Sequence, residues 1–159
     1  MVRIQFRILL FLLFGFLTFN FSVFAQSGPV LNEFKSSESN SDCVEIYNSA
    51  DSSIDLKDYS ISHAASSSKS LTCILAPSGF LTIDWNNNLN NSGDVIYLTR
   101  AGEIVDCVAY GDGAGLRCPG KEQIDLSKLA ASESGAREVD GSVVWKITGN
   151  ISKDGPNDG

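Results

Sequence analysis

The side chains of this chain best suited to acid–base chemistry are five carboxylates in or beside β-prone stretches: Glu33, Glu45, Asp84, Asp94 and Asp106. Glycoside hydrolysis needs two carboxyl groups that converge on one cleft, about 5–10 Å apart, with separated pKa values. Sequence spacing shows no such convergence. A carboxylate at a strand end also has a structural use, because it accepts hydrogen bonds from backbone N–H groups or from arginine. We favour this structural interpretation and predict no catalytic residue.

Two of the carboxylates have specific structural interpretations. Asp94 follows Gly93 and is expected to fix a turn before the strand that it begins. Asp106 is expected to face Tyr97 across a hairpin and to make a cross-strand hydrogen bond. A small extracellular hydrolase that uses a carboxylate pair stays open as an alternative hypothesis.

Nucleophilic catalysis and metal binding find little support in the residue types. His63 is the single histidine, and we interpret it as an exposed loop residue because no nucleophile elbow is nearby. One histidine and four dispersed cysteines do not match a zinc site. Asp51 and Asp55 begin like a calcium loop, but the glycine and glutamate that an EF-hand needs later are missing. We predict no cofactor and no metal ligand, although loop carboxylates could hold a weakly bound calcium ion.

The four cysteines predict disulfides if the chain is exported. The glycine-rich stretch 112–120 can fold back on the strand before it, so we favour a Cys107–Cys118 bridge together with Cys43–Cys73. Cys43 and Cys107 both lie on predicted strands, so a bridge between these two is an alternative. Free buried thiols are the outcome expected in a compartment that is not oxidising.

Trp85 is the candidate ligand contact. It ends a predicted strand next to Asn86, Asn87 and Asn88, and an aromatic ring beside amide side chains can stack on a sugar and hydrogen-bond to it. The interpretation that we favour places the Trp85 ring at the end of a hydrophobic core. Trp145, between apolar neighbours, is also predicted to lie in the core.

A hairpin in the middle of the chain is the clearest structural element. Asp94–Arg100 and Glu103–Tyr110 are rich in Val, Ile, Tyr and Thr, and Gly102 suits the tight turn between them. A two-residue loop would pair Leu98 with Val105, Ile96 with Cys107 and Tyr97 with Asp106. It would place Ile96, Leu98, Val105 and Cys107 on one face, and Val95, Tyr97, Ile104, Val108 and Tyr110 on the other. A three-residue loop would shift this register by one residue and exchange the faces, so the core face stays open.

Short apolar runs between polar turns predict further strands at Pro29–Lys35, Asp42–Asn48, Asp58–Ser62, Lys69–Leu75, Gly79–Trp85 and Ser142–Ile147. Gln123–Ser132 could form one short helix, since Ile124, Leu126, Leu129 and Ala130 are spaced for one apolar face. Residues 149–159 lack apolar anchors and are predicted to be a flexible tail. This pattern predicts an all-β antiparallel sandwich over residues 26–148.

Composition and the first 25 residues predict where the protein works. A net charge of −7 over 159 residues, with no basic cluster, argues against nucleic acid as a partner. Residues 1–25 have a basic start, an apolar stretch and small residues before a cleavage site at Ala25. The alternative is an uncleaved anchor, which we disfavour because Thr18, Asn20 and Ser22 interrupt the apolar run. No second hydrophobic segment appears. We expect a mature chain without a membrane span that is secreted, periplasmic or on the cell surface.

Six motifs, taken in order, resemble the lamin tail domain family: VLNEF at 30–34, CVEIYN at 43–48, IDLKDYSI at 54–61, LAPSGFLTI at 75–83, LNNSGDVIYL at 89–98 and EIVDCVAYG at 103–111. ESGAR at 133–137, VVW at 143–145 and GPN at 155–157 resemble the end of that domain. The resemblance implies an immunoglobulin-like β-sandwich that serves as an interaction surface and has no catalytic residues. It does not imply nuclear filament assembly, because an export signal stands where lamins have a coiled coil.

Together these observations predict an exported, non-catalytic binding or surface-association module. Its partner would be an extracellular protein or a cell-surface glycan. A structural subunit of an envelope assembly is a second alternative, which requires an edge strand that another chain can extend.

Overall fold

The computed structural model describes residues 27–36, 41–65, 67–112 and 115–157, so the predicted signal peptide lies outside the described residues. Eleven strands stand in this part of the chain: β1 (Pro29–Lys35), β2 (Cys43–Asn48), β3 (Ile54–Asp55), β4 (Tyr59–His63), β5 (Ser68–Ser70), β6 (Ile74–Leu75), β7 (Phe80–Asp84), β8 (Gly93–Arg100), β9 (Glu103–Gly111), β10 (Ser134–Arg137) and β11 (Trp145–Thr148). Within the ranges just given, no helix has the length and apolar character needed to cross a membrane.

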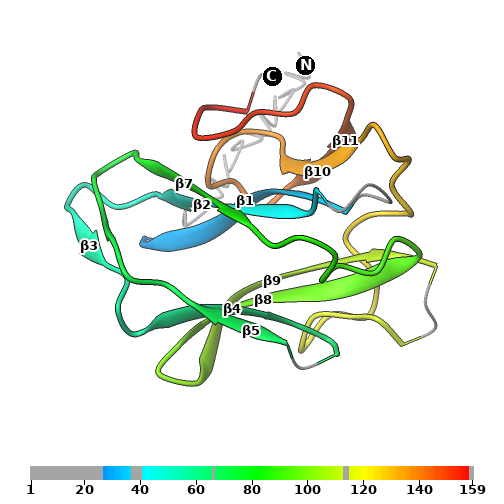
Figure 1. Cartoon of the computed structure of the whole chain (residues 1–159), viewed down its shortest axis with the longest axis horizontal. Coiled ribbons are helices and arrows are strands. Elements are labelled where there is room, and N and C mark those ends of the chain that lie inside the picture. The colour runs from blue at the N-terminus through cyan, green and yellow to red at the C-terminus, as the bar shows by residue number, and fades with distance from the viewer. Residues whose placement is uncertain (1–26, 37–40, 66, 113–114, 158–159) are drawn as a thin grey trace, which may run out of the picture.

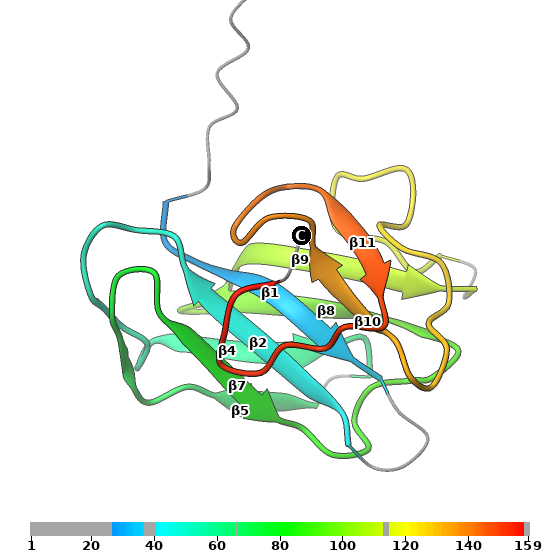
Figure 2. The ribbon, with the colours of Figure 1, turned by 90° about the horizontal axis from the view of Figure 1, so that it is seen from above.

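Two antiparallel sheets face each other, as Figure 1 shows. The upper layer has five strands in the order β11-β10-β1-β2-β7, and the lower layer has four in the order β5-β4-β8-β9. The short pair β3–β6 closes one end. In Figure 2, β7 lies above β5 at one side, while β9, β10 and β11 lie at the other. The predicted all-β antiparallel sandwich is therefore confirmed.

The core between the layers comes from residues that alternate along each strand. Val44 and Ile46 of β2 point inward, as do Ile61 of β4 and Ile96 of β8, and all four side chains are fully buried. Burying one such side chain stabilises the fold by about 2 kcal/mol. The same core contains Trp85, and Trp145 packs against it.

The hairpin of β8 and β9 combines features of both predicted registers. Ala101 and Gly102 form the two-residue turn with positive φ angles of 50° and 88°, and next to it Arg100 faces Glu103 while Thr99 faces Ile104. A β-bulge then inserts one extra residue into β9, which shifts all later pairs by one. The predicted pairs Leu98–Val105, Ile96–Cys107 and Tyr97–Asp106 are therefore wrong.

The bulge also decides which face of the hairpin is the core. Val108 and Tyr110 of β9 join Ile96 and Leu98 of β8 in the main core. On the outer face, Val95, Cys107, Ala109 and Cys118 form a second, small apolar cluster against which Tyr97 packs.

Several local predictions are corrected by the fold. Lys69–Leu75 is interrupted and gives two short strands, β5 and β6. Gln123–Ser132 is an extended segment and not a helix, because its backbone bonds to the edge of β9: the N–H groups of Asp125 and Leu126 both donate to the carbonyl of Ala109. This arrangement buries Leu126 and Leu129 in the core without a helix.

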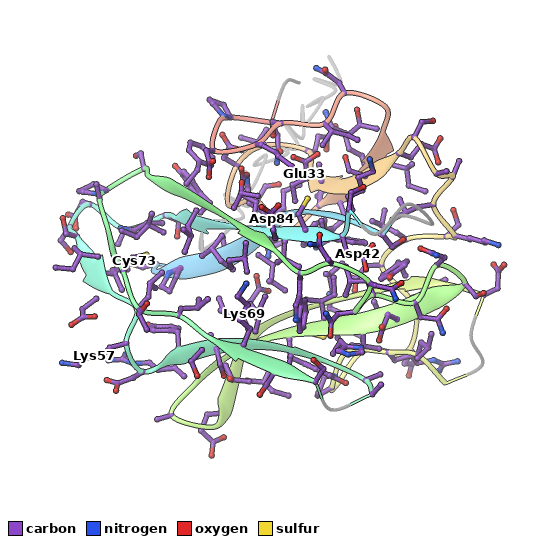
Figure 3. The ribbon with its side chains drawn as sticks, in the orientation of Figure 1. Glu33, Asp42, Lys57, Lys69, Cys73 and Asp84 are labelled. Carbon is purple, nitrogen blue, oxygen red and sulfur yellow. A yellow bond between two sulfur atoms is a disulfide. The ribbon has the colours of Figure 1, made fainter. Side chains whose placement is uncertain are left out.

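The predicted bridge between Cys107 and Cys118 is present, with an S–S distance of 2.03 Å. In the chain-entropy model, closing a loop of 11 residues stabilises the fold by about 3 kcal/mol. Cys43 and Cys73 are free thiols, so the predicted Cys43–Cys73 bridge and the Cys43–Cys107 alternative are both wrong. Cys43 begins β2, whereas Cys73 lies by β3 at the end of the sandwich, where Figure 3 labels it.

The segment that we predicted to be a flexible tail is bound to the sandwich as far as it is described. Residues 149–157 cross the outer face of the five-stranded sheet from β11 towards β7 and turn back, as the red segment in Figure 2 shows. Ser152, Lys153, Asp154 and Asn157 all make polar contacts with that sheet or its turns. We call residues 149–157 the strap.

Candidate functional site

One side of the sandwich has an open groove between two edge strands, β9 of the lower sheet and β11 of the upper sheet. The groove has a volume of about 380 Å³. It is lined by Ile104, Val105, Asp106, Cys107, Cys118, Pro119, Lys121, Arg137, Val143 and Trp145. We call this the edge groove.

Three local features shape the edge groove. The bulge in β9 follows the tight turn and places Val105 against the core from the groove side. The disulfide carries Cys118 and Pro119 back to the wall that β9 forms. The turn between β10 and β11 brings Val143 to the opposite wall.

A buried ion pair joins the two walls. The Arg137 guanidinium lies 2.5 Å from the Asp106 carboxylate, and both side chains are at most 10% exposed. Asp106 also accepts a hydrogen bond of 2.8 Å from the Leu31 N–H, while Arg137 donates to the carbonyls of Leu31 and Ser142. The guanidinium lies 4.7 Å from the centre of the Trp145 ring. This network gives Asp106 a structural role, and it replaces the predicted hydrogen bond to Tyr97.

Exposed apolar side chains gather at the same edge. Val143, Val144 and Ile104 are 61%, 52% and 47% exposed, and Val139 in the same β10–β11 turn is 66% exposed. Large apolar side chains that are left together in water often mark an interaction surface. Lys121, 46% exposed and paired with Asp125, adds one charged group at the rim.

The predicted candidate carboxylates lie in four separate places. Asp106 is in the network above, Asp84 is exposed near Lys153, and Asp94 lies beside His63. Glu33 and Glu45 do meet, as opposite residues on β1 and β2, but each is only 2% exposed. They lie beneath the strap and are not open to a cleft, so the arrangement gives no support to a hydrolase.

His63 is buried and not an exposed loop residue as predicted. It ends β4 with 8% exposure, and its Nδ1 lies 2.9 Å from the Asp94 carboxylate. Asp94 also accepts hydrogen bonds from the N–H groups of Ala64, Asn90 and Val95. The carboxylate thus fixes the turn before β8, as predicted, and it orients the histidine as part of the same structural network.

The environment of Trp85 supports the core position that we favoured over the candidate ligand contact. The side chain is 5% exposed and belongs to the main core, and its ring meets the His63 ring edge-on at 5.3 Å. The Asn88 amide donates to the carbonyls of Trp85 and Asn86, so it caps its own turn. A sugar would find no open face of Trp85 on which to stack.

The candidate calcium loop is also accounted for by local contacts. The Asp55 carboxylate accepts a hydrogen bond from the Lys57 N–H and lies 3.5 Å from the Lys57 ammonium group. Across the part of the chain that the structure describes, no three His, Cys, Asp or Glu residues gather as metal ligands would.

Sequence reasoning missed the edge groove because its parts are distant in the chain. β10 was not predicted as a strand, since Ser134–Arg137 shows no alternation of apolar and polar residue types. The signals in the sequence that could have pointed to the groove were the ESGAR motif and the two valines at 143–144. Nothing in the sequence reveals that these valines are exposed.

Comparison with known proteins agrees with this architecture. The family model described as Lamin Tail Domain matches residues 23–112, which is more than half of the chain. Searches of curated proteins and of solved structures found no match. The matched family has an immunoglobulin-like fold without catalytic function, in agreement with the two facing antiparallel sheets. This chain therefore belongs to the lamin tail domain family.

Proposed function

We propose that this protein is an exported, non-catalytic binding module that holds an extended segment of a partner protein in the edge groove. The observation that carries the proposal is the coincidence of a hollow with exposed apolar side chains at the edges of both sheets. A partner strand placed along β11 would gain backbone hydrogen bonds, and its alternate side chains would enter the groove.

The groove can supply useful affinity. Each apolar side chain of a partner that is fully buried there contributes about 2 kcal/mol. The Arg137–Asp106 network fixes the groove walls before binding, so little ordering cost falls on the protein itself. Two or three anchoring side chains would supply about 4–6 kcal/mol, which corresponds to a Kd between about 1 mM and tens of micromolar.

Two features support action outside the cytosol. Residues 1–25 have the pattern of an export signal. The Cys107–Cys118 bridge forms one wall of the groove, and such bridges persist in oxidising compartments. A protein partner fits better than a glycan, because Trp85 offers no open ring face.

The experiment selects peptides against the purified protein from a displayed random library and measures their Kd by fluorescence polarisation. Val143→Asp should weaken binding by tenfold or more, because it places a charge in the apolar wall. Ile74→Asp is the matched control, since Ile74 is 73% exposed on β6, outside the groove lining. Equal binding by both variants would contradict the proposal. Analytical ultracentrifugation of the protein alone tests whether a second copy occupies the groove. In that case the protein would self-associate, and Val143→Asp would abolish the association.

A further inference from the structure

The strap covers a polar surface on the outer face of the five-stranded sheet, away from the edge groove. Asp154 exchanges two hydrogen bonds with Thr82 of β7, at 2.7 and 3.0 Å. The Asn157 amide donates to the carbonyls of Asn32 and Arg137, and the Asn157 N–H donates to Asp140. Polar contacts with several strands and their turns therefore hold the strap.

Two carboxyl groups lie side by side beneath it. Glu33 and Glu45 face each other on β1 and β2, and both are 2% exposed although they point away from the core. Figure 3 shows Glu33 between the sheet and the strap. The strap itself contributes the Ser152 hydroxyl, which donates to Glu33 at 2.8 Å, and backbone groups that hydrogen-bond to Glu33 and Glu45.

The hydrogen bonds to this pair come from neutral groups. Glu33 also accepts a bond of 2.5 Å from the Ser134 hydroxyl, and Glu45 accepts from the Asn32 amide at 3.0 Å and the Thr82 hydroxyl at 3.4 Å. The titratable or charged groups around the pair are Lys35 on β1, Cys43 on β2, Asp84 on β7, Arg137 on β10, Asp140 in the β10–β11 turn, and Lys153 and Asp154 in the strap. Two of the cations in this set are engaged elsewhere, since Lys153 pairs with Asp84 and Arg137 with Asp106.

Two buried carboxylates without a cation between them are costly when both are ionised. Burial raises the pKa of Glu45 to about 7. The Glu33 charge adds to this effect, and hydrogen bonds from the Asn32 side chain and from the backbone of Asp154 and Gly155 reduce it without cancelling it. Burial likewise raises the pKa of Glu33, against hydrogen bonds from Ser134 and Ser152.

We propose that the strap is a pH-sensitive cover, which closes over Glu33 and Glu45 when this pair holds a proton and opens as the pH rises past neutrality. When the strap lifts, the two carboxyl groups meet water and ionise readily. Closing the strap removes that water, so the closed state binds a proton more tightly than the open state. Closure therefore becomes less favourable as the pH rises. The Lys153–Asp84 pair is exposed on both sides and opposes opening only weakly.

Cys43 provides a direct measure of opening. Its thiol is free, 4% exposed and on the same outer face of β2 as Glu45. The strap lies close to it, since the charge of Lys153 acts on the thiol. A reagent should therefore reach Cys43 only when the strap lifts.

The experiment measures the rate at which iodoacetamide alkylates Cys43 in a Cys73→Ser background, by intact mass. Dividing the rate in unfolded protein at the same pH by the native rate gives a protection factor, which removes the change in thiolate fraction. We expect this factor to fall by about tenfold or more between pH 5.5 and pH 8. Glu45→Gln should make it nearly constant, whereas Glu103→Gln, an exposed control, should leave the fall unchanged.

Three results would overturn the proposal. The first is a protection factor in the parent protein that does not change with pH, and the second is a fall with pH in Glu45→Gln as large as in the parent protein. The third is a protection factor that stays as high as in the parent protein after deletion of residues 149–159. Tryptophan fluorescence that stays native over the pH range separates strap opening from unfolding. If the deletion variant does not fold, the parent protein and Glu45→Gln decide the question.

Discussion

Replacing Glu45 with glutamine is expected to stabilise the protein at pH 8 while changing little at pH 4. The Glu45 pKa is about 7 in the folded protein and 4.5 in the absence of burial. The folded state therefore holds the proton more tightly than the unfolded chain, so the contribution of this group is fully present below about pH 4.5. It is lost as the pH rises through 7.

The size of the effect follows from the gap between these two pKa values, which corresponds to about 3 kcal/mol at 25 °C. Glutamine keeps the shape of the side chain and an oxygen that accepts the Asn32 hydrogen bond. It carries no charge at any pH, so the variant should lose the part of the pH dependence that Glu45 causes.

The assay is urea unfolding at pH 4, 6 and 8, followed by the fluorescence of Trp85 and Trp145. The free energy of unfolding of Glu45→Gln should exceed that of the parent protein at pH 8 by up to about 3 kcal/mol, the value that applies if the strap stays closed, with a smaller gain at pH 6. Glu103→Gln, on an exposed hairpin position, is the matched control. Equal stability of Glu45→Gln and the parent protein at pH 8, or a loss in the variant, would refute the reasoning, because the ionised carboxylate would then be well accommodated.

Further predictions concern the groove network, the disulfide and the core. Arg137→Ala should cost about 3–5 kcal/mol in urea unfolding, since it leaves the Asp106 carboxylate buried without its partner. Replacing both Cys107 and Cys118 with serine should cost about 3 kcal/mol and weaken peptide binding, whereas Cys73→Ser should leave binding unchanged. Trp85→Ala should cost about 3–5 kcal/mol through a core cavity. If the parent protein bound a glycan on an array and the folded Trp85→Ala variant did not, that result would contradict the assignment of Trp85 to the core.

Local chemistry accounts for the elements that the sequence predicts well. Runs of β-branched and aromatic residues predict most strands with bounds within one or two residues of those observed, because these runs alternate with polar residues and are bounded by turn residues. The two-residue turn at Ala101-Gly102 was also readable, since Gly102 suits the positive φ that the turn needs. The bulge beyond it was not, because inserting Val105 depends on how β9 packs against the other sheet and not on its own residue type.

Long-range polar contacts account for what the sequence did not reveal. The strap has no apolar pattern, and its hydrogen bonds join Asp154 to Thr82 and Ser152 to Glu33, residues far apart in the chain. His63 was read as exposed because its partner, Asp94, lies on another strand. The edge groove likewise combines β9 with the turn between β10 and β11, which is distant in the chain.

The edge groove and the strap meet at Arg137, whose guanidinium pairs with Asp106 in the groove wall and whose carbonyl accepts a hydrogen bond from Asn157 of the strap. The groove uses apolar walls held by the Arg137–Asp106 pair. The strap uses polar contacts over Glu33 and Glu45. Val143→Asp and Glu45→Gln separate the two, because Val143 lines the groove and Glu45 does not.

The most direct test of the proposed binding role is a nuclear magnetic resonance titration of isotope-labelled protein with the best selected peptide. The groove predicts chemical shift changes centred on Ile104, Val143 and Trp145, together with protected amides in the bound peptide. Changes centred instead on the loop around Asn87 and Asn88, or on the strap, with the groove unperturbed, would contradict it.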